Sequence, residues 1–266
     1  MNTPISLADA SADLERRFGG LRRLYGVAGY RRLRAARVAV VGLGGVGSWA
    51  AEALARSGVA RLVLIDLDHV AESNINRQVQ ALGATLGQAK VLALRERIAD
   101  IHPGCEVHCV EAFADESNWP ALLPHPVDVV IDACDQVRAK ERIAALAMQA
   151  CSLLVVAGAA GGKRQPQAVQ VDDLARVTHD PLLAGLRQRL RKHHGAPREG
   201  TMGVCCVFSR ETVQRPGQPG AIEGSLNCAG YGSSVTVTAT FGMVAANAAL
   251  ELLLNPAAIT GTPSPI

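Results

Sequence analysis

Short apolar runs alternate along the chain with longer segments in which apolar residues recur every three or four positions. The runs are rich in β-branched residues, and several end at a glycine or an acidic residue, which is typical of buried strands in a parallel sheet. The longer segments have the spacing of helices that pack one face on such a sheet. The expected strands are residues 38–41, 62–65, 106–110, 127–131 and 153–156, and the expected helices are residues 48–55, 88–101 and 136–150. This alternation predicts an α/β fold, with a Rossmann-like, mostly parallel sheet and helices on both faces.

The pattern changes at both ends of this core. Residues 14–37 are rich in arginine and predict one or two amphipathic helices, whereas a glycine-rich stretch follows residue 156. Beyond it the architecture changes from residues 168–171 onwards, and we expect a helix from 179 to 194 and a strand from 204 to 208. The expected parts are a disordered N-terminus at 1–13, a nucleotide-binding domain at 14–171, a smaller C-terminal α/β portion at 172–254 packed on the same sheet, and a flexible tail at 255–266.

Residues 235–254 form an apolar segment that is long enough to span a bilayer. Three threonines, Asn247 and Glu251 interrupt its apolar surface, and its flanks lack charged anchors. We therefore expect a helix packed against the sheet and no membrane span.

The composition is that of an α/β protein that folds without covalent cross-links. Of 266 residues, 48% are apolar and 19% are charged, and a net charge of +3 does not by itself indicate a polyanionic partner. Seven cysteines without a signal peptide or a C-x-x-C pair indicate reduced thiols, no structural zinc and a cytoplasmic location. The P-loop and nucleophile-elbow motifs are missing from the sequence, which removes those two classes.

The first expected strand leads into a glycine-rich turn that can hold a phosphate. Gly42, Gly44 and Gly47 follow this strand, and the helix after them directs its positive N-terminal end towards an anion. Asp66 ends the second strand, where its carboxylate can accept hydrogen bonds from both ribose hydroxyls. Strand, turn, helix, strand and acid in this order predict a nucleotide site and leave the nucleotide open.

A polar connection of unusual length follows Asp66. It carries Asn74, Arg77 and Gln78, and Lys90 lies near the start of the next helix. These residues can bring an amide, a guanidinium and an ammonium group back to the nucleotide end of the sheet. Such a set of donors suits a triphosphate and a departing pyrophosphate better than a dinucleotide. The alternative is that Arg77 and Lys90 are ordinary surface charges.

Two acids mark the carboxyl end of the strand at 127–131. Asp132 and Asp135 lie at the edge where open α/β sheets place ligands, and a carboxylate there can hold Mg²⁺ directly or through water. Asp135 could equally cap the helix at 136–150.

Two features of the C-terminal portion also carry possible chemistry. Arg189, Arg191 and Lys192 form a basic run that suits RNA phosphates and equally suits a solvated helix surface. Cys228 lies in a long glycine-rich connection, either as an exposed reactive thiol or as an inert buried one.

Several motifs together resemble a known family. GLGGVGS, LIDLD, NINRQ, Lys90 and DACD resemble the adenylating domain of the ubiquitin-activating-enzyme-like (ThiF/MoeB-type) family. RFGGLRRLYG, GVCCVFSRE and NCAGYGSSVTVTATFG resemble its tRNA threonylcarbamoyladenosine dehydratase branch, and the resemblance covers roughly residues 14–254.

The resemblance implies an ATP and Mg²⁺ site, a homodimer and a role for each candidate residue. Arg23 from the N-terminal segment of a second subunit would complete the site, and Cys228 is a possible covalent catalyst. The implied assignments are the phosphate turn to Gly42, Gly44 and Gly45, the ribose acid to Asp66, phosphate donors to Asn74, Arg77, Gln78 and Lys90, and the metal acid to Asp135.

The implied activity is ATP-dependent dehydration of threonylcarbamoyladenosine beside a tRNA anticodon, by carboxylate adenylation and ring closure. Three alternatives remain open at this point. They are an adenylyltransferase of a ubiquitin-like sulfur-carrier protein, a nicotinamide-dependent oxidoreductase, and a sulfur-relay scaffold that uses Cys228 with a cysteine-desulfurase or sulfur-acceptor system.

Overall fold

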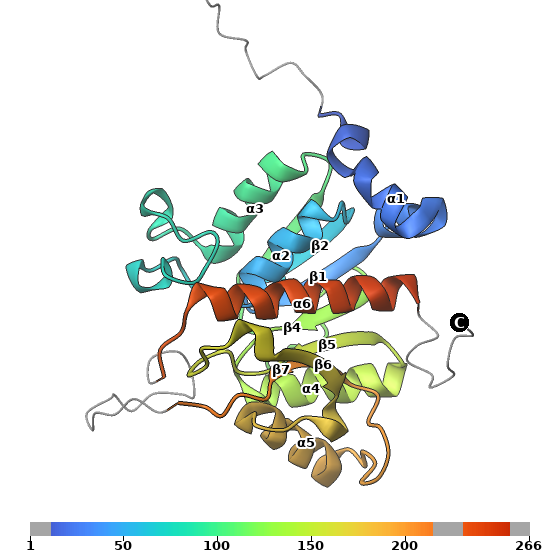
Figure 1. The fold of residues 1–266 in the computed structure, drawn as a ribbon, viewed down its shortest axis with the longest axis vertical. Coiled ribbons are helices and arrows are strands. Elements are labelled where there is room, and N and C mark those ends of the chain that lie inside the picture. The colour runs from blue at the N-terminus through green and yellow to red at the C-terminus, as the bar shows by residue number, and fades with distance from the viewer. Residues whose placement is uncertain (1–11, 215–230, 256–266) are drawn as a thin grey trace, which may run out of the picture.

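The chain folds around one seven-stranded sheet with the strand order β3-β2-β1-β4-β5-β7-β6 (Figure 1). The computed structural model describes residues 12–214 and 231–255. Strand β6 runs antiparallel to β7, whereas the other neighbouring strands are parallel, so the predicted α/β class is confirmed. The strands are β1 (Arg37–Val41), β2 (Arg61–Ile65), β3 (Glu106–Val110), β4 (Val129–Asp132), β5 (Leu153–Ala157), β6 (Val169–Asp173) and β7 (Cys205–Ser209).

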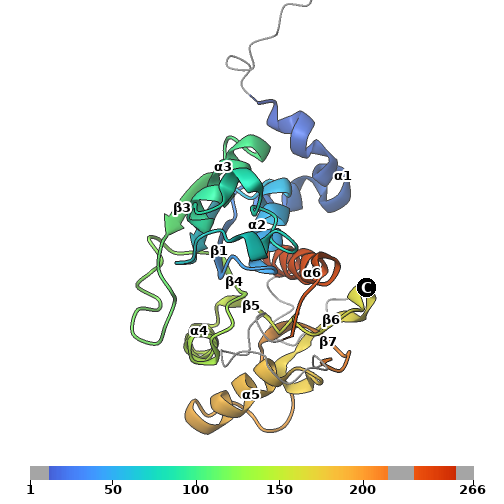
Figure 2. The same ribbon diagram turned by 90° about the vertical axis from the view of Figure 1, so that its left-hand side faces the viewer.

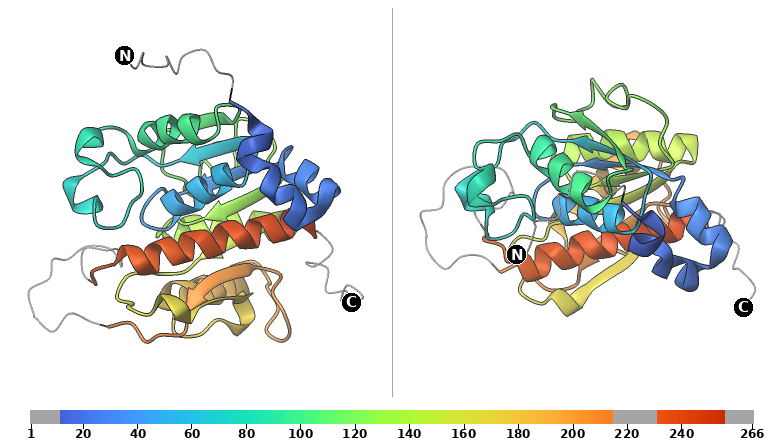
Figure 3. Two further views of the ribbon diagram at one scale, coloured as in Figure 1. Left: turned by 45° about the horizontal axis from the view of Figure 1, so that its top comes forward. Right: turned by 90° about the horizontal axis from the view of Figure 1, so that it is seen from above.

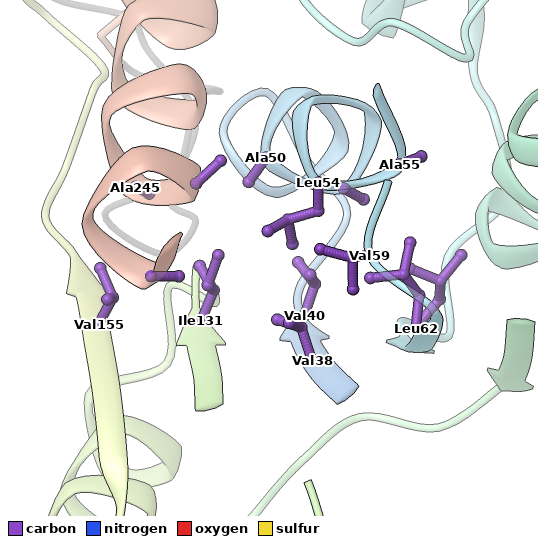
Figure 4. Packing of buried hydrophobic residues seen from close by; sticks show 14 of the residues in the cluster. Val38, Val40, Ala50, Leu54, Ala55, Val59, Leu62, Ile131, Val155 and Ala245 are labelled. Carbon is purple, nitrogen blue, oxygen red and sulfur yellow. The ribbon is translucent and has the colours of Figure 1, made fainter. Parts of the chain in front are cut away.

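Helices cover both faces of the sheet (Figure 2). On one face lie α2 (Gly47–Arg56), α3 (Lys90–Ile101) and α6 (Val235–Leu254), and on the other lie α4 (Val137–Ala150) and α5 (Pro181–His193). Side chains alternate along each strand, so Val38 and Val40 face α2 whereas Ala39 and Val41 face the opposite layer (Figure 4). The strands are therefore apolar on both sides, which explains their unbroken apolar runs.

Helix α6 is the apolar segment whose length would suffice for a membrane span. Here it crosses the sheet beside α2, and Val237, Phe241 and Ala245 are buried in the larger core cluster (Figure 3). The two helices approach closely at Gly242, where a Cβ would lie 2.5 Å from the carbonyl oxygen of Val46. Most of its apolar surface is thus used inside the protein, as the sequence predicted.

Helix α1 (Leu14–Leu33) lies at the edge of the sheet where the strands begin. It consists of two helical parts joined by a kink at Gly26, whose φ is +70°. Arg17 donates hydrogen bonds to the carbonyl oxygens of Asp100 and Ile101 at the end of α3, and Arg32 donates to Leu253 and Leu254 at the end of α6. The two parts of α1 therefore pack on the C-terminal ends of α3 and α6, two helices that start at the edge of the sheet where the strands end.

The sheet continues through the segment in which the sequence placed a domain boundary. Strand β6 contains residue 171, and β7 joins it to β5. Helix α5 begins at Pro181, two residues later than expected, because Asp180 accepts the Leu183 N–H and caps the helix while His179 has a φ of +59°. Short 3-10 turns occupy Glu72–Asn74, Gly83–Thr85, Pro166–Ala168 and Leu174–Arg176.

Candidate active site

The carboxyl ends of β1, β2 and β4 border a cavity of about 710 Å³. Strand β1 pairs with β2 on one side and β4 on the other, and the helices α2 and α4 that follow β1 and β4 cover opposite faces. This is the switch point at which open α/β sheets bind ligands. The residues that line it include most of those expected at the nucleotide and metal sites, namely Gly42, Gly44, Gly45, Asp66, Asn74, Arg77, Gln78, Lys90 and Asp135. Asp132, the other acid expected at this edge, is instead fully buried, pairs with Lys140 and does not line the cavity.

The glycine turn is required by close packing. Gly42 has a φ of +84°, and a Cβ there would lie 2.9 Å from the backbone nitrogen of Cys134. A Cβ on Gly47 would lie only 1.8 Å from the carbonyl oxygen of Gly42. Val46, the N-cap of α2, makes no side-chain capping bond, and the Ser48 N–H donates to the Gly44 carbonyl oxygen at 3.2 Å. The positive end of this helix therefore faces the glycine turn, where an anion can bind.

Two alanine substitutions should separate nucleotide binding from folding. Gly44 lines the cavity with nothing within 4 Å of an added Cβ, so Gly44→Ala should keep the free energy of unfolding within about 1 kcal/mol of wild type. It should weaken nucleotide binding about tenfold to a hundredfold, because the methyl group keeps a phosphate from the backbone donors. Gly47→Ala should instead cost about 1–3 kcal/mol or more of unfolding free energy. Urea unfolding and nucleotide titration measure both, and normal nucleotide binding by Gly44→Ala would contradict the phosphate assignment.

Asp66 is buried at the end of β2, with 7% of its surface exposed. Its Oδ2 accepts the Leu43 N–H at 2.6 Å, and its Oδ1 accepts the Asp68 N–H at 2.8 Å. Burial raises the pKa of Asp66, although the Lys90 ammonium and these two N–H groups oppose the rise. Because a carboxylate has about four acceptor positions, it can still receive ribose hydroxyls.

Lys90 is held between two carboxylates. It opens α3, as predicted, and its Nζ lies 2.7 Å from Asp68 Oδ2 and 4.0 Å from Asp66 Oδ1. Only 5% of the residue is exposed, so Lys90 is not the ordinary surface charge of the alternative interpretation. An ammonium group has three donors, and those not used by Asp68 remain for a phosphate in the cavity.

Arg77 is positioned beside the glycine turn by two helices. Its carbonyl oxygen accepts hydrogen bonds from Trp49 Nε1 of α2 at 3.0 Å and from Thr238 Oγ1 of α6 at 3.3 Å. A Cβ on Gly45 would lie 3.5 Å from Arg77 Cγ. One guanidinium nitrogen donates to the Ser73 carbonyl and the Asn76 side chain, and the buried Nε has no partner among the described residues.

Asp135 lies at the cavity rim with its side chain exposed. Gln136 is the N-cap of α4, and no side chain caps this helix, so the alternative role of Asp135 as a cap is wrong. Partial burial raises the pKa of Asp135, and the nearby Asp68 carboxylate adds to the rise. Within residues 12–214 and 231–255, no three His, Cys, Asp or Glu side chains gather into a metal cage. Mg²⁺ usually takes one or two carboxylates plus phosphates and water, so this acid pair fits a metal that binds with a nucleotide.

The cavity contains residues that the sequence did not single out. Asp68 follows a strand-end acid by two positions and could have been suspected from that pattern. Arg138 lines the cavity from the first turn of α4, is exposed, and forms no ion pair with a described residue. Phe113, which is 56% exposed, also lines the cavity. It belongs to a loop in which Asp115 Oδ1 accepts the Asn118 N–H. No spacing rule marks Arg138 or Phe113, because a loop and a helix start leave no periodic signal.

Of the remaining candidates, Arg23, Arg189, Arg191 and Lys192 do not line this cavity. Arg189 forms an ion pair with the buried Glu141 of α4, and Arg191 donates hydrogen bonds to the carbonyls of Pro197 and Arg198, whereas Lys192 is exposed. Arg23 is exposed on α1. Cys228 lies outside the described residues, and its predicted roles stay predictions.

The chain is similar to known proteins over nearly its whole length. The ThiF family model matches residues 17–264. The tRNA threonylcarbamoyladenosine dehydratase of Escherichia coli (strain K12) is 42% identical over 257 residues, which are 92% of this chain and 96% of the relative. The crystal structure of the E. coli tRNA N6-threonylcarbamoyladenosine dehydratase in complex with ATP has a TM-score of 0.84 at 41% identity, covering 95% of this chain and 100% of that chain.

A sulfur-carrier enzyme is similar over a shorter stretch. The molybdopterin-synthase adenylyltransferase of E. coli (strain K12) is 37% identical over 132 residues, which are 50% of this chain and 52% of the relative. The similarity to the dehydratases, in contrast, covers nearly the whole of both chains. The chain therefore belongs to the ThiF family, and the relatives that match it from end to end are tRNA threonylcarbamoyladenosine dehydratases.

Proposed function

We propose that this chain is an ATP-dependent tRNA threonylcarbamoyladenosine dehydratase that closes the threonylcarbamoyl side chain into a ring. The observation that carries the proposal is the cavity at the switch point, which brings together the glycine turn, Asp66, Asn74, Arg77, Gln78, Lys90 and Asp135. The dehydratase relatives, which match the chain from end to end, support the substrate. A reaction on tRNA also favours a cytoplasmic location.

The first step is adenylation of the substrate carboxylate. A carboxylate oxygen bonds to the α-phosphorus of ATP, and the bond from that phosphorus to the pyrophosphate oxygen breaks. Arg77 and the free donors of Lys90 stabilise the charge that develops on the pyrophosphate, while Asp66 holds the ribose. Asn74 and Gln78, both buried at the cavity, would complete the set of phosphate donors.

The second step closes the ring and releases AMP. An atom of the neighbouring carbamoyl group attacks the activated carbonyl carbon, and the carbon–oxygen bond to AMP breaks, so the net loss is one water. Nucleophile and electrophile belong to one side chain, which supplies proximity without a protein nucleophile. A thioester on Cys228 would be an additional route and would need that thiol within reach of the acyl group.

Asp135 would hold Mg²⁺, with Asp68 near it. When bound, the metal would neutralise charge on the phosphate oxygens. The Asp135 carboxylate would set the position of the metal–nucleotide complex. Because this carboxylate is exposed at the rim, the other coordination positions of the metal would remain open to phosphate and water.

A homodimer would complete the site with Arg23 of the second subunit. Arg32 of α1 binds Leu253 of α6, and Thr238, fifteen residues earlier on that helix, binds Arg77 at the cavity. At 1.5 Å per residue, the end of α1 at Arg32 lies about 22 Å along α6 from the cavity. This separation favours a second subunit as the source of Arg23. Leu24 and Val27 expose 70% and 53% of their surfaces on α1, as expected for a helix that a partner covers.

Mixing two inactive variants should test this shared site. Arg23→Ala and Asp135→Ala homodimers should each lose most adenylation, and random subunit exchange should restore roughly a quarter of wild-type activity, because half of the dimers then contain one intact site. Arg17→Ala is the control, because Arg17 binds carbonyls of its own chain. Mixed with Asp135→Ala, it should give the same activity as wild type mixed with Asp135→Ala. Full activity of the Arg23→Ala homodimer would exclude Arg23.

Removing the exposed basic charges of α5 should test tRNA binding. Arg191→Gln with Lys192→Gln should weaken tRNA binding and lower the slope of log affinity against log salt by about one per lost phosphate contact. Arg189 is left intact because it pairs with Glu141 and supports the fold. Arg95→Gln, at an exposed position on α3, is the matched control. An unchanged slope would assign the run to solvated surface.

One experiment separates the proposed function from its alternatives. The protein is incubated with ATP, Mg²⁺ and bulk tRNA, and the nucleosides of the digested tRNA are weighed. Loss of one water from threonylcarbamoyladenosine supports the dehydratase, whereas AMP on a small carrier protein supports the sulfur-carrier adenylyltransferase. Neither product would favour the sulfur-relay scaffold.

A further inference from the structure

A lysine and an aspartate are fully buried together behind the rim of the active-site cavity. Lys140 and Asp132 are both 0% exposed. Lys140, in the first turn of α4, donates from Nζ to Asp132 Oδ1 at 3.1 Å and to the Asp132 carbonyl oxygen at 3.2 Å. The pair therefore ties the start of α4 to the last residue of β4.

The segment between these two anchors carries Asp135. Asp132 Oδ1 also accepts the Cys134 N–H at 3.1 Å, and the Ala133 N–H donates to the Val41 carbonyl at 2.8 Å. Because no side chain caps α4, a cap does not set the path of this segment. Asp132 and Lys140 hold it on one side, and the end of β1 holds it on the other.

Joining a strand to a helix through this ion pair costs free energy of folding. Burying two charges costs several kcal/mol per ion, and apolar residues of similar volume often stabilise a protein equally well or better. Asp132 Oδ2 is in addition buried without a hydrogen-bond partner among the described residues, which adds to the cost. Stability alone does not account for the arrangement, whereas a fixed direction of the segment does.

We propose that Lys140 and Asp132 are positioning residues that set the place of the Asp135 carboxylate and thereby the affinity for the metal–nucleotide complex. The proposal rests on the proposed role of Asp135 as the metal acid. Neither residue of the pair lines the cavity, so both act through the backbone of residues 133–135.

The test removes the pair without leaving a lone buried charge. Lys140→Met with Asp132→Asn replaces both ions by neutral groups of similar size. Mn²⁺ binding in the presence of a non-hydrolysable ATP analogue is measured by electron paramagnetic resonance, and binding of the analogue alone is measured without metal. We expect Mn²⁺ binding to weaken about tenfold, as is usual when a support of a metal ligand is lost, and metal-free nucleotide binding to change less than about twofold.

A second ion pair, with a buried carboxylate, supplies the control. Glu52 of α2 is 4% exposed and pairs with Arg97 of α3, whose side chain is 35% exposed, and neither residue lines the cavity. Glu52→Gln with Arg97→Met should lower thermal stability and leave Mn²⁺ binding unchanged.

The outcomes distinguish this inference from the proposed function. If Asp135→Asn loses Mn²⁺ binding while the Lys140/Asp132 double variant keeps it, the positioning role is wrong and the metal assignment stands. If Asp135→Asn itself binds Mn²⁺ normally, the metal assignment fails and the inference fails with it. Equal weakening of metal and metal-free nucleotide binding by the double variant would also overturn the positioning role.

Discussion

Asp135→Ala should reduce ATP–pyrophosphate exchange by at least about a hundredfold while the protein remains folded, because the loss of a charge-stabilising group has an effect of this size. Asp135 is exposed at the cavity rim and does not cap α4, so its removal takes little from the core. Relief of its unfavourable partial burial and of its repulsion with Asp68 should leave stability equal or slightly higher. Exchange assays and thermal unfolding of the same preparation provide the two measurements.

Glu116→Gln is the matched control for this variant. Glu116 is an exposed acid that lines the same cavity, so its change removes the same charge from the site without removing the proposed metal acid. We expect exchange to fall less than about threefold. If Asp135→Ala and Glu116→Gln catalyse exchange at the same rate, the loss of a negative charge accounts for any decrease in exchange. The assignment of Asp135 as the metal acid would then be abandoned.

Arg77→Ala and Lys90→Met should each slow adenylation by about two orders of magnitude, the usual loss when one preorganised donor is removed. The two variants should differ in stability. Lys90 is buried between Asp66 and Asp68, so its loss leaves carboxylates without their cation and should lower the free energy of unfolding by about 1–3 kcal/mol. Arg77 donates only to nearby loop oxygens, and its replacement should be nearly neutral.

Comparing ATP with AMP in these variants locates the donors. Removing a donor to the pyrophosphate should lower affinity for ATP more than affinity for AMP, because AMP lacks the group that the donor binds. Arg77→Lys keeps the charge but loses the planar fork, and it should recover only part of the rate. Unchanged exchange in either variant would remove that residue from the mechanism.

Much of the fold was predictable because its signals are local. Buried parallel strands need unbroken apolar runs, and the runs at 38–41, 62–65 and 153–156 became β1, β2 and β5 with ends shifted by one residue. Helix α5 was placed two residues too early, because its start depends on the Asp180 side chain and not on the apolar period. The glycine turn was identifiable because Gly42 and Gly47 answer a steric demand that only a missing Cβ can meet.

The sequence by itself determined the order of elements, the switch-point edge and the residue types delivered to it, since acids and glycines at strand ends follow from position along the chain. Only the tertiary structure decided which groups neutralise one another. Lys90 with Asp68, Arg189 with Glu141 and Lys140 with Asp132 join residues on separate elements or across a helix start. Such pairs depend on sheet order and helix packing, which bring charges together at distances that spacing along the chain does not encode. Helix packing also pairs Arg189, from the basic run on α5, with Glu141 of α4. It holds α1, which carries Arg23, at the sheet edge opposite the cavity of the same chain.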